Sequence, residues 1–227
     1  MAGKLYIVST PIGNYEDITL RALKILKEVD FIICEEYKEA RRLLSYFKIS
    51  KELHSINEHN EKENADEIIS IIAQGKSAAL ISDCGTPLFS DPGSLLVQLA
   101  IQNRIEVIPV PGVSSLLAAL VGSGINFEKF YYCGWLSPKK EIRKKEILEL
   151  KKRKEVIVIM DTPYRLKTLL EDVANHWSKN VPIVLAFELT KPGEKFYRGS
   201  CQEVLMLAMK ENLKGEFVLI VNNKSTA

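Results

Sequence analysis

The sequence predicts an α/β protein with two α/β domains, the first on a mainly parallel sheet and the second on a mixed sheet. Two observations predict this fold class. Short β-branched or aromatic runs alternate with segments of helical period up to about residue 124, an order typical of a parallel sheet covered on both faces. Farther along, strand candidates follow each other closely, which indicates a mixed sheet. We expect domains at residues 1–115 and 116–227.

In the first domain, apolar runs that are bounded by polar turns predict strands, and apolar residues that recur every three or four positions predict helices. In 18–29, for example, Leu20, Leu23, Ile25 and Leu26 share roughly one helical face. The expected strands are 4–9, 30–35, 53–56, 77–82 and 105–110. The expected helices are 18–29, 39–47, 61–74 and 93–103, and a further helix at 113–124 falls where the two domains join.

In the second domain, the same rules predict strands at 129–136, 155–161, 182–189, 195–200 and 215–222. Helices are expected at 139–154, 164–177 and 201–212. The short gap between 182–189 and 195–200 indicates a hairpin, hence an antiparallel pair. Residues 139–153 include eight Lys or Arg and only three Glu. There Ile142, Ile147, Leu148 and Leu150 predict the apolar side of an amphipathic helix.

Composition narrows the class of protein. Hydrophobic residues make up 46% and charged residues 26% of the chain, values typical of globular domains. A net charge of +2 does not by itself predict a nucleic-acid partner. The four cysteines are scattered on apolar runs, so we expect reduced core thiols in a cytoplasmic protein. The sequence shows neither a signal peptide nor an apolar run long enough for a membrane span.

Four loops rich in Pro or Gly follow predicted strands: "STPIGN" (9–14), "SDCGTP" (82–87), "PVPGVSS" (109–115) and "MDTPYR" (160–165). Ligands of open α/β sheets bind outside the carboxyl ends of parallel strands, so we expect these loops to converge on a site. The chain lacks the GxGxxG, GxxxxGK[ST] and GxSxG motifs, which disfavours the corresponding nucleotide and hydrolase sites. His54 and His59 lack metal-ligand spacing, and we expect no metal.

Several of these segments together resemble the tetrapyrrole-methylase superfamily and, within it, the ribosomal RNA small subunit methyltransferase I family. The segments are "TPIGN" (10–14) followed by "DITLRA" (17–22), "SDCGTPLFSDPG" (82–93), "VIPVPGVSS" (107–115), "ELTKPGEKFYRG" (188–199) and "GEFVLIV" (215–221). The resemblance implies a homodimer that binds S-adenosylmethionine in a cleft between two domains. It also implies methylation of a cytidine ribose 2′-hydroxyl in RNA of the small ribosomal subunit.

The resemblance also implies cofactor contacts, carried over motif by motif. They fall in the loops after the predicted strands and on the sheet of the second domain. The expected cofactor-binding residues are Pro11, Asp83, Cys84, Gly85, Thr86, Ser90, Ser114, Ser115, Met160, Ala186 and Phe217. Carbonyl groups and a carboxylate such as Asp83 suit the positive charge of a sulfonium.

The acceptor side is less defined by the sequence. A ribose hydroxyl is a poor nucleophile, so a base would help, and the catalytic candidates are Glu36, Glu58, Glu188 and Lys191, with Glu35 and His59 beside them. Arg41, Arg42, Lys144, Lys145 and Arg165 are the RNA-binding candidates, and Arg21 and Arg198 could extend their surface. Tyr37, Trp135 and Tyr164 could stack on a base.

Two departures from the family pattern affect this acceptor side. "EEYKEARRLL" (35–44) stands where the family typically has "EDTRxTxKLL", and "DTPYR" (161–165) stands in place of "ESPHR". They leave open a different acceptor, or a cofactor-binding protein of the ribosome that has lost catalysis. A tetrapyrrole acceptor is disfavoured because the second loop reads "SDCGTP" and not "GGDP".

Overall fold

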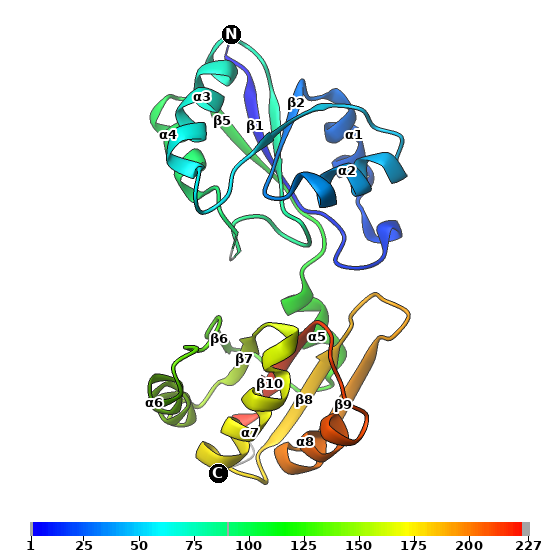
Figure 1. The fold of residues 1–227 in the computed structure, drawn as a ribbon, viewed down its shortest axis with the longest axis vertical. Helices are drawn as coiled ribbons and strands as arrows, with labels where there is room; N and C mark the ends of the chain where they lie inside the picture. Colours follow the sequence, from blue (N-terminus) through cyan, green and yellow to red (C-terminus); the bar gives the residue numbers. More distant parts are fainter. Residues whose placement is uncertain (1, 90, 224–227) are drawn as a thin grey trace. The chain divides into compact units, whose positions relative to one another are not determined.

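The computed structural model describes residues 2–89 and 91–223 (Figure 1). The chain forms two compact units, Met1–Ser114 and Ser115–Ala227. Each unit has its own sheet and its own hydrophobic core. The α/β class with a parallel and a mixed sheet is therefore confirmed.

The first unit is a five-stranded sheet in the order β3-β2-β4-β1-β5, and every pair of neighbours is parallel. Its strands are β1 (Lys4–Val8), β2 (Phe31–Cys34), β3 (Glu52–Ser55), β4 (Ala78–Ile81) and β5 (Glu106–Val110). Its helices are α1 (Leu20–Glu28), α2 (Tyr37–Tyr46), α3 (Glu61–Ala73) and α4 (Ser94–Gln102), with a 3-10 turn η1 (Tyr15–Asp17).

Helices cover both faces of this sheet, as predicted. On one face, Ile25 and Leu26 of α1 and Leu43 of α2 pack with Val8 and Ile32 of the sheet. On the other, α3 and α4 pack against alternate strand residues such as Leu5, Phe31 and Ile33. Because side chains alternate across a strand, fully apolar strands such as "FIIC" feed both cores.

The second unit is a mixed sheet in the order β6-β7-β10-β8-β9. β6 runs parallel to β7, while β10 is antiparallel to both β7 and β8, and β8 and β9 form the predicted hairpin. The strands are β6 (Phe130–Tyr132), β7 (Val156–Met160), β8 (Pro182–Phe187), β9 (Lys195–Ser200) and β10 (Phe217–Val221). The helices are α5 (Ser115–Ser123), α6 (Lys140–Lys151), α7 (Leu166–His176) and α8 (Cys201–Lys210), with a 3-10 turn η2 (Pro163–Arg165).

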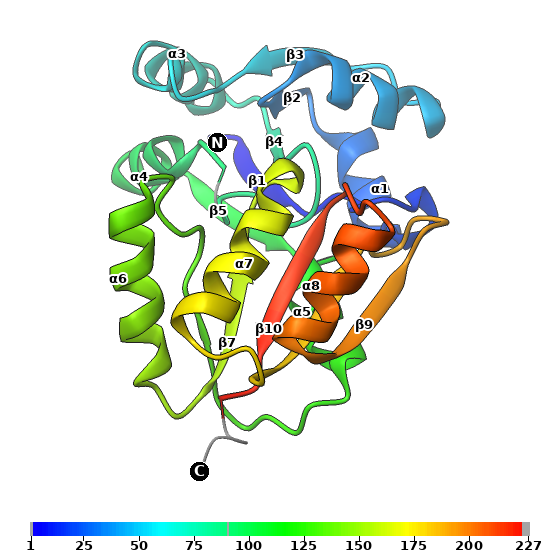
Figure 2. The same ribbon diagram turned by 60° about the horizontal axis from the view of Figure 1, so that its bottom comes forward.

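Helices α6, α7 and α8 are drawn in Figure 2 beside the strands of the second sheet. They bury Ile147, Leu170 and Val204 in one core with Ile159 and Leu219 of the sheet. Helix α5 packs against β8 and β10. Arg198 of β9 donates to the carbonyls of Gly122 and Ser123 at 2.6 and 3.0 Å, so it caps the carboxyl end of α5.

Three expected side-chain positions are wrong. Leu20 is 86% exposed because it is the first residue of α1, and the buried face begins at Ala22. Ile142 and Leu148 are exposed on α6, while Arg143 is buried beside Ile147 and Leu150. Arg143 can occupy the buried face because Asp172 of α7 lies within hydrogen-bond distance. No helix in the described ranges is both long and apolar enough to cross a bilayer.

Candidate functional site

Three of the four loops meet at one edge of the first sheet, while the fourth, residues 160–165, follows β7 in the second unit. β4, β1 and β5 are neighbours and run parallel, so the loops that follow them leave the sheet together. Thr10 and Gly85 pair through two backbone bonds, Thr10 N to Gly85 O at 2.8 Å and Gly85 N to Thr10 O at 3.1 Å. Ser9 N donates to Val110 O at 3.2 Å. The three loops form one connected structure, called here the loop cluster (residues 9–14, 82–87 and 110–114).

Hydroxyl groups complete the loop cluster. Thr10 Oγ1 donates to Ser82 O at 3.2 Å, and Ser82 Oγ donates to Gly85 O at 2.9 Å. Thr86 Oγ1 donates to Val113 O at 3.1 Å and lies 3.4 Å from Ser9 Oγ. Since buried polar groups must find partners, these bonds fix each loop relative to the next. The chain's own hydrogen bonds therefore join the three loops.

Two glycines explain the composition of these loops. Gly85 has a φ of +82°, a left-handed conformation that L-residues rarely adopt, and a Cβ there would lie 3.2 Å from Ile12 Cγ2. A Cβ on Gly112 would lie 2.8 Å from Ser9 Cβ. The close approach of the loops thus requires glycine at both positions.

The second half of "SDCGTPLFSDPG" has a different task. Glu61, the first residue of α3, accepts hydrogen bonds from Gly93 N and Leu95 N, both at 2.9 Å. It satisfies free N–H groups at the amino end of α4. Nothing in the sequence marked Glu61, because its partners lie more than thirty residues away. Ser90 lies outside the described residues.

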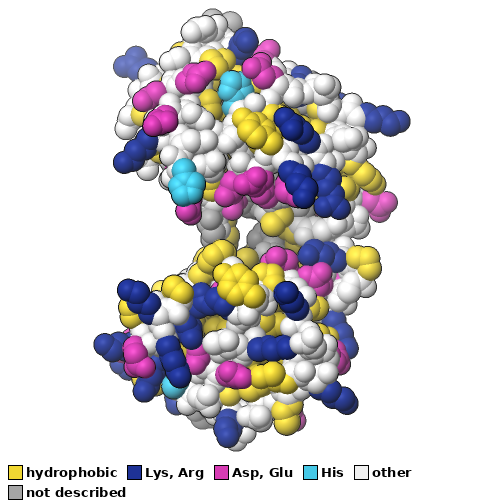
Figure 3. All heavy atoms as spheres, viewed as in Figure 1, with side chains coloured by type: hydrophobic (Ala, Val, Ile, Leu, Met, Phe, Trp, Pro, Cys, Tyr) yellow, Lys and Arg dark blue, Asp and Glu magenta, His cyan; other side chains and the backbone are white. Residues whose placement is uncertain are grey.

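Carboxylates gather beside the loop cluster at the carboxyl ends of β2 and β4. Asp83 Oδ1 accepts from Glu36 N at 3.3 Å, which joins this loop to the start of α2. Burial, and then the charges of Asp83 and Asp91, raise the pKa of Glu35; burial likewise raises the pKa of Asp83 and of Asp91. Figure 3 shows Asp and Glu side chains grouped on part of the first unit. We call Glu35, Asp83 and Asp91 the acidic edge. Their negative charge favours the binding of a cation.

In the second unit, the expected cofactor residues share one end of the sheet. Met160, at the end of β7, and Ala186 of β8 are both register partners of Val218 in β10. Phe217 pairs with Phe187 one position away. Ala186 and Phe217 are buried and Met160 is half-buried. Ser114 ends the first unit and Ser115 opens α5.

Buried ion pairs organise the loops of the second unit. Arg143 Nε donates to Asp172 Oδ2 at 2.6 Å, and its NH1 donates to the carbonyls of Ser137 and Pro138, each at 2.9 Å. Arg165 NH2 donates to Leu136 O at 3.0 Å and lies 3.3 Å from Asp161 Oδ2. Two arginines therefore hold the segment 136–138.

These contacts determine which of the candidate RNA-binding side chains are available to RNA. The side chain of Arg165 is only 17% exposed, so little of it is left for RNA. Arg198 is committed to the carbonyls that end α5. Lys144 and Lys145 are exposed on α6, as are Arg41 and Arg42 on α2. Trp135 and Tyr164, 57% and 75% exposed, flank the bonded pair Leu136 and Arg165 in sequence.

The catalytic candidates are divided between the two units. Glu36 precedes α2 beside Asp83, and Glu58 is exposed in the turn before α3. Glu188 Oε1 accepts from Lys191 Nζ at 3.1 Å and from Glu216 N at 2.6 Å, so this pair ties a loop to β10. Glu188 also has a φ of +50°, a strained backbone conformation.

Cysteine positions are partly as expected. Cys34 and Cys201 are buried and Cys133 is half-buried, but Cys84 is exposed in the loop cluster, so the expectation of a core thiol is wrong there. Over residues 2–89 and 91–223, no three His, Cys, Asp or Glu side chains are grouped to hold a metal ion.

The family described as Tetrapyrrole (Corrin/Porphyrin) Methylases matches residues 4–205. Ribosomal RNA small subunit methyltransferase I of Bacillus subtilis (strain 168) is 40% identical over 223 residues, 98% of this chain and 76% of that protein. The protein of the same name from Thermotoga maritima is 40% identical over 222 residues, 98% of this chain and 99% of that protein.

Solved structures agree on the fold. Uroporphyrin-III-C-methyltransferase from Thermus thermophilus has a TM-score of 0.68 at 20% identity, with 98% of this chain and 96% of that chain covered. A cobalt precorrin-4 methyltransferase has a TM-score of 0.72 at 20% identity, with 96% and 94% covered. The chain therefore belongs to the Tetrapyrrole (Corrin/Porphyrin) Methylases and, within them, to the ribosomal RNA small subunit methyltransferase I family.

Proposed function

We propose that this protein is an S-adenosylmethionine-dependent methyltransferase that methylates a cytidine ribose 2′-hydroxyl in small-subunit ribosomal RNA. The observation that carries the proposal is the 40% identity to relatives named for small-subunit ribosomal RNA, which extends over nearly the whole chain. The internally hydrogen-bonded loop cluster and its acidic edge support it, since they suit a small cationic ligand.

The residues present fit such a cofactor. Gly85 and Gly112 leave backbone atoms open at positions where a side chain would not fit. We propose Pro11, Asp83, Cys84, Gly85 and Thr86 as its contacts in the first unit, together with Ser114. Ser115, Met160, Ala186 and Phe217 are the proposed contacts in the second. When bound, the cofactor supplies a methyl group on a positively charged sulfur.

The carboxylates of the acidic edge would offset the positive charge of the cofactor. Burial raises the pKa of both Asp83 and Glu35; the charges of Glu36 and Glu39 add to the rise at Asp83, and those of Asp83 and Asp91 add to it at Glu35. A nearby cation would offset this repulsion between carboxylates. Loss of the positive charge after transfer would remove the attraction, so the same carboxylates favour exchange of product for fresh cofactor. Loops that are hydrogen-bonded to one another would hold the donor in one orientation, and positioning supplies much of the rate in such transfers.

For the group that takes the proton from the ribose hydroxyl, we propose four candidates: Glu36, Glu58, Glu188 and Lys191. Glu36 is favoured by its place beside Asp83. Glu188 already accepts from Glu216 N and Lys191 Nζ, so it is better suited to holding its loop. A Glu36→Gln variant that keeps cofactor affinity but loses transfer would support Glu36, and unchanged transfer would exclude it.

Labelled S-adenosylmethionine tests the function directly. The protein is incubated with small ribosomal subunits that lack this modification, and the labelled nucleotide is mapped. A single labelled 2′-O-methylcytidine is expected. Label at another RNA position would show that the acceptor is a different nucleotide. Binding of cofactor and subunits without methyl transfer would show that the protein is a binder without catalytic activity. Absence of cofactor binding in calorimetry would overturn the proposal.

Helix α6 is the proposed RNA surface of the second unit. Lys144 and Lys145 are exposed there, and Figure 3 shows Lys and Arg side chains clustered on this unit. Charge reversal at both should weaken binding to small subunits and flatten its salt dependence. Equal binding at every salt concentration would return α6 to a purely structural role.

We also propose a homodimer that works in the cytoplasm, where its ribosomal substrate would be found. Exposed apolar residues support self-association: Leu117 and Val121, four residues apart on α5, are 54% and 76% exposed. Light scattering after size exclusion checks this state, and a monomer at all concentrations would contradict it.

A further inference from the structure

We propose that the first unit has a second RNA contact, a basic groove between α2 and β3 that binds the backbone of single-stranded RNA. The groove is a cavity of about 580 Å³. Three cationic side chains line it, Arg41 of α2 and Lys48 and Lys51 of the segment before β3. This inference rests on the proposed function, because the acceptor there is RNA.

The lining chemistry selects an anion. Besides the three cations, the groove exposes two hydroxyls, those of Ser45 and Ser50, and it includes no carboxylate. Leu44 and Ile49, 3% and 8% exposed, form part of an apolar floor. Cationic and hydroxyl groups on a fixed floor are the partners that phosphate oxygens find in protein–nucleic acid complexes.

These cations are not neutralised within the protein. In the ranges that the structure describes, Arg41, Lys48 and Lys51 make no ion pair with a carboxylate. Arg41 lies over the ring of Tyr37, with Cζ 5.5 Å from its centroid, and this contact limits its mobility. Lys51 Nζ donates to Val29 O at 2.5 Å. Arg41 and Lys48 are therefore the two cations of the groove whose charge an external ligand can use.

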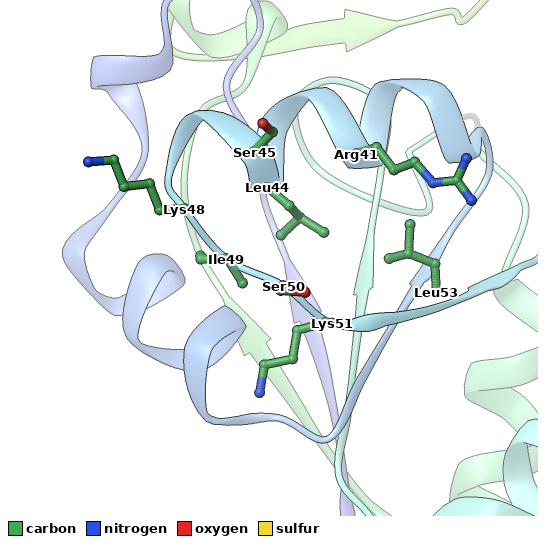
Figure 4. Close-up of a pocket in the computed structure, with 8 residues that line it drawn as sticks. All are labelled: Arg41, Leu44, Ser45, Lys48, Ile49, Ser50, Lys51 and Leu53. Atoms are coloured by element: carbon green, nitrogen blue, oxygen red, sulfur yellow. The ribbon is translucent and has the colours of Figure 1, made fainter.

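The spacing of the cations favours a chain of phosphates over one anion. Figure 4 shows Arg41 and Lys48 at opposite ends of the groove and Lys51 on the strand side, with the apolar residues between them. A single phosphate cannot contact both ends. Successive phosphates of one strand can, and the apolar floor can take the sugars between them.

Helix α2 links this groove to the loop cluster. Its amino end begins after Glu36, whose N–H donates to Asp83, and its later turns carry Arg41, Leu44 and Ser45. RNA held in the groove would therefore act on the same helix that anchors the acidic edge. The segment 35–44, which runs into α2, reads "EEYKEARRLL" where the family pattern differs.

Anisotropy of a fluorescent single-stranded RNA of about 20 nucleotides tests the groove over a series of salt concentrations. The groove variant is Arg41→Gln with Lys48→Asn, since asparagine tolerates the left-handed φ of +54° at position 48. The matched control, Lys62→Gln with Lys76→Gln, removes the same charge from exposed positions outside the groove. We expect about tenfold weaker binding for the groove variant alone, with a log–log salt slope smaller by about 1.4, two contacts at about 0.7 each.

The outcomes separate the two proposals. If the wild type binds neither this RNA nor small subunits, the proposed function fails as well. If the wild type binds RNA, the α6 variant weakens binding and the groove variant matches its control, only the groove is overturned. If polyglutamate displaces the fluorescent RNA as well as unlabelled RNA of equal charge does, the ligand of the groove would be an acidic protein segment. Inorganic phosphate that competes at the same phosphate concentration would reduce it to a single-anion site.

Discussion

The two units fix their loops by different means. In the first, Thr10, Ser82, Gly85 and Thr86 join three loops through backbone and hydroxyl bonds. In the second, buried guanidinium groups from α6 and η2 reach back to the carbonyls of residues 136–138. In the first unit, small residues leave backbone groups accessible to a ligand. In the second, the arginines already bond to the carbonyls of the segment that they hold in place. The difference suits ligand contact through the backbone in the first unit and presentation of side chains such as Trp135 and Tyr164 in the second.

The largest effect should come from breaking a buried ion pair. Arg143→Met leaves the carboxylate of Asp172 buried without its closest partner, and loss of one partner of a buried pair costs about 3–5 kcal/mol. Both tryptophans, Trp135 and Trp177, belong to the second unit. Urea unfolding followed by tryptophan fluorescence therefore reports on this unit, and its midpoint should fall.

Two further variants make the ion-pair measurement specific. Arg143→Met with Asp172→Leu should recover much of the loss, because no uncompensated charge remains. Lys144→Met changes the neighbouring exposed residue of the same helix and should leave the midpoint unchanged. A single Arg143→Met variant as stable as the wild type would show that this pair does not hold the second unit.

A smaller effect is expected at Gly85 in the first unit. An alanine would have to adopt the left-handed φ of +82°, which costs an L-residue about 1–2 kcal/mol. Hydrogen exchange in peptides covering 78–114 should accelerate, while the tryptophan unfolding curve stays in place. A shift of that curve instead would contradict the independence of the two loop systems.

A smaller change still is expected from Thr10→Val. The substitution keeps the shape of the side chain but removes the donor to Ser82 O, a loss of about 0.5–1.5 kcal/mol for a typical hydrogen bond. The same peptides should show moderately faster exchange. Thr168→Val, an exposed threonine of α7, is the control, and equal behaviour of both variants would refute the contribution of this bond.

The smallest effect concerns pH. The folded-state pKa values of Glu35, Asp83 and Asp91 are raised, so the folded chain binds more protons than the unfolded one in the range above about 4. Stability of the free protein should therefore fall as pH rises through this range. A bound cation favours the ionised carboxylates, so affinity for S-adenosylmethionine should rise with pH.

S-Adenosylhomocysteine is the matched ligand for this measurement, because it lacks the positive charge on sulfur. Calorimetry between about pH 4.5 and 7.5 should show a weaker pH dependence for it than for the charged cofactor. Parallel curves for the two ligands would separate the acidic edge from cofactor binding.

Sequence reasoning predicted the elements and the convergence of loops for a geometric reason. The carboxyl ends of parallel strands necessarily share an edge, so the loops after β4, β1 and β5 could be placed together. It failed where a polar side chain acts over a long separation. Arg143 resembles a surface residue in a charged run, and Glu61 resembles an ordinary first-turn acid. Only the folded chain brings Asp172 to the first and Gly93 to the second.

The exposure of Cys84 makes the loop cluster chemically addressable. Burial raises the pKa of the thiols of Cys34, Cys133 and Cys201 to about 12, so these stay protonated and unreactive at neutral pH. A maleimide dye should therefore attach at Cys84 without removal of any native cysteine. Because Cys84 is itself a proposed contact, bound S-adenosylmethionine should slow the reaction of this thiol with maleimide, and the labelling rate then reports occupancy of the loop.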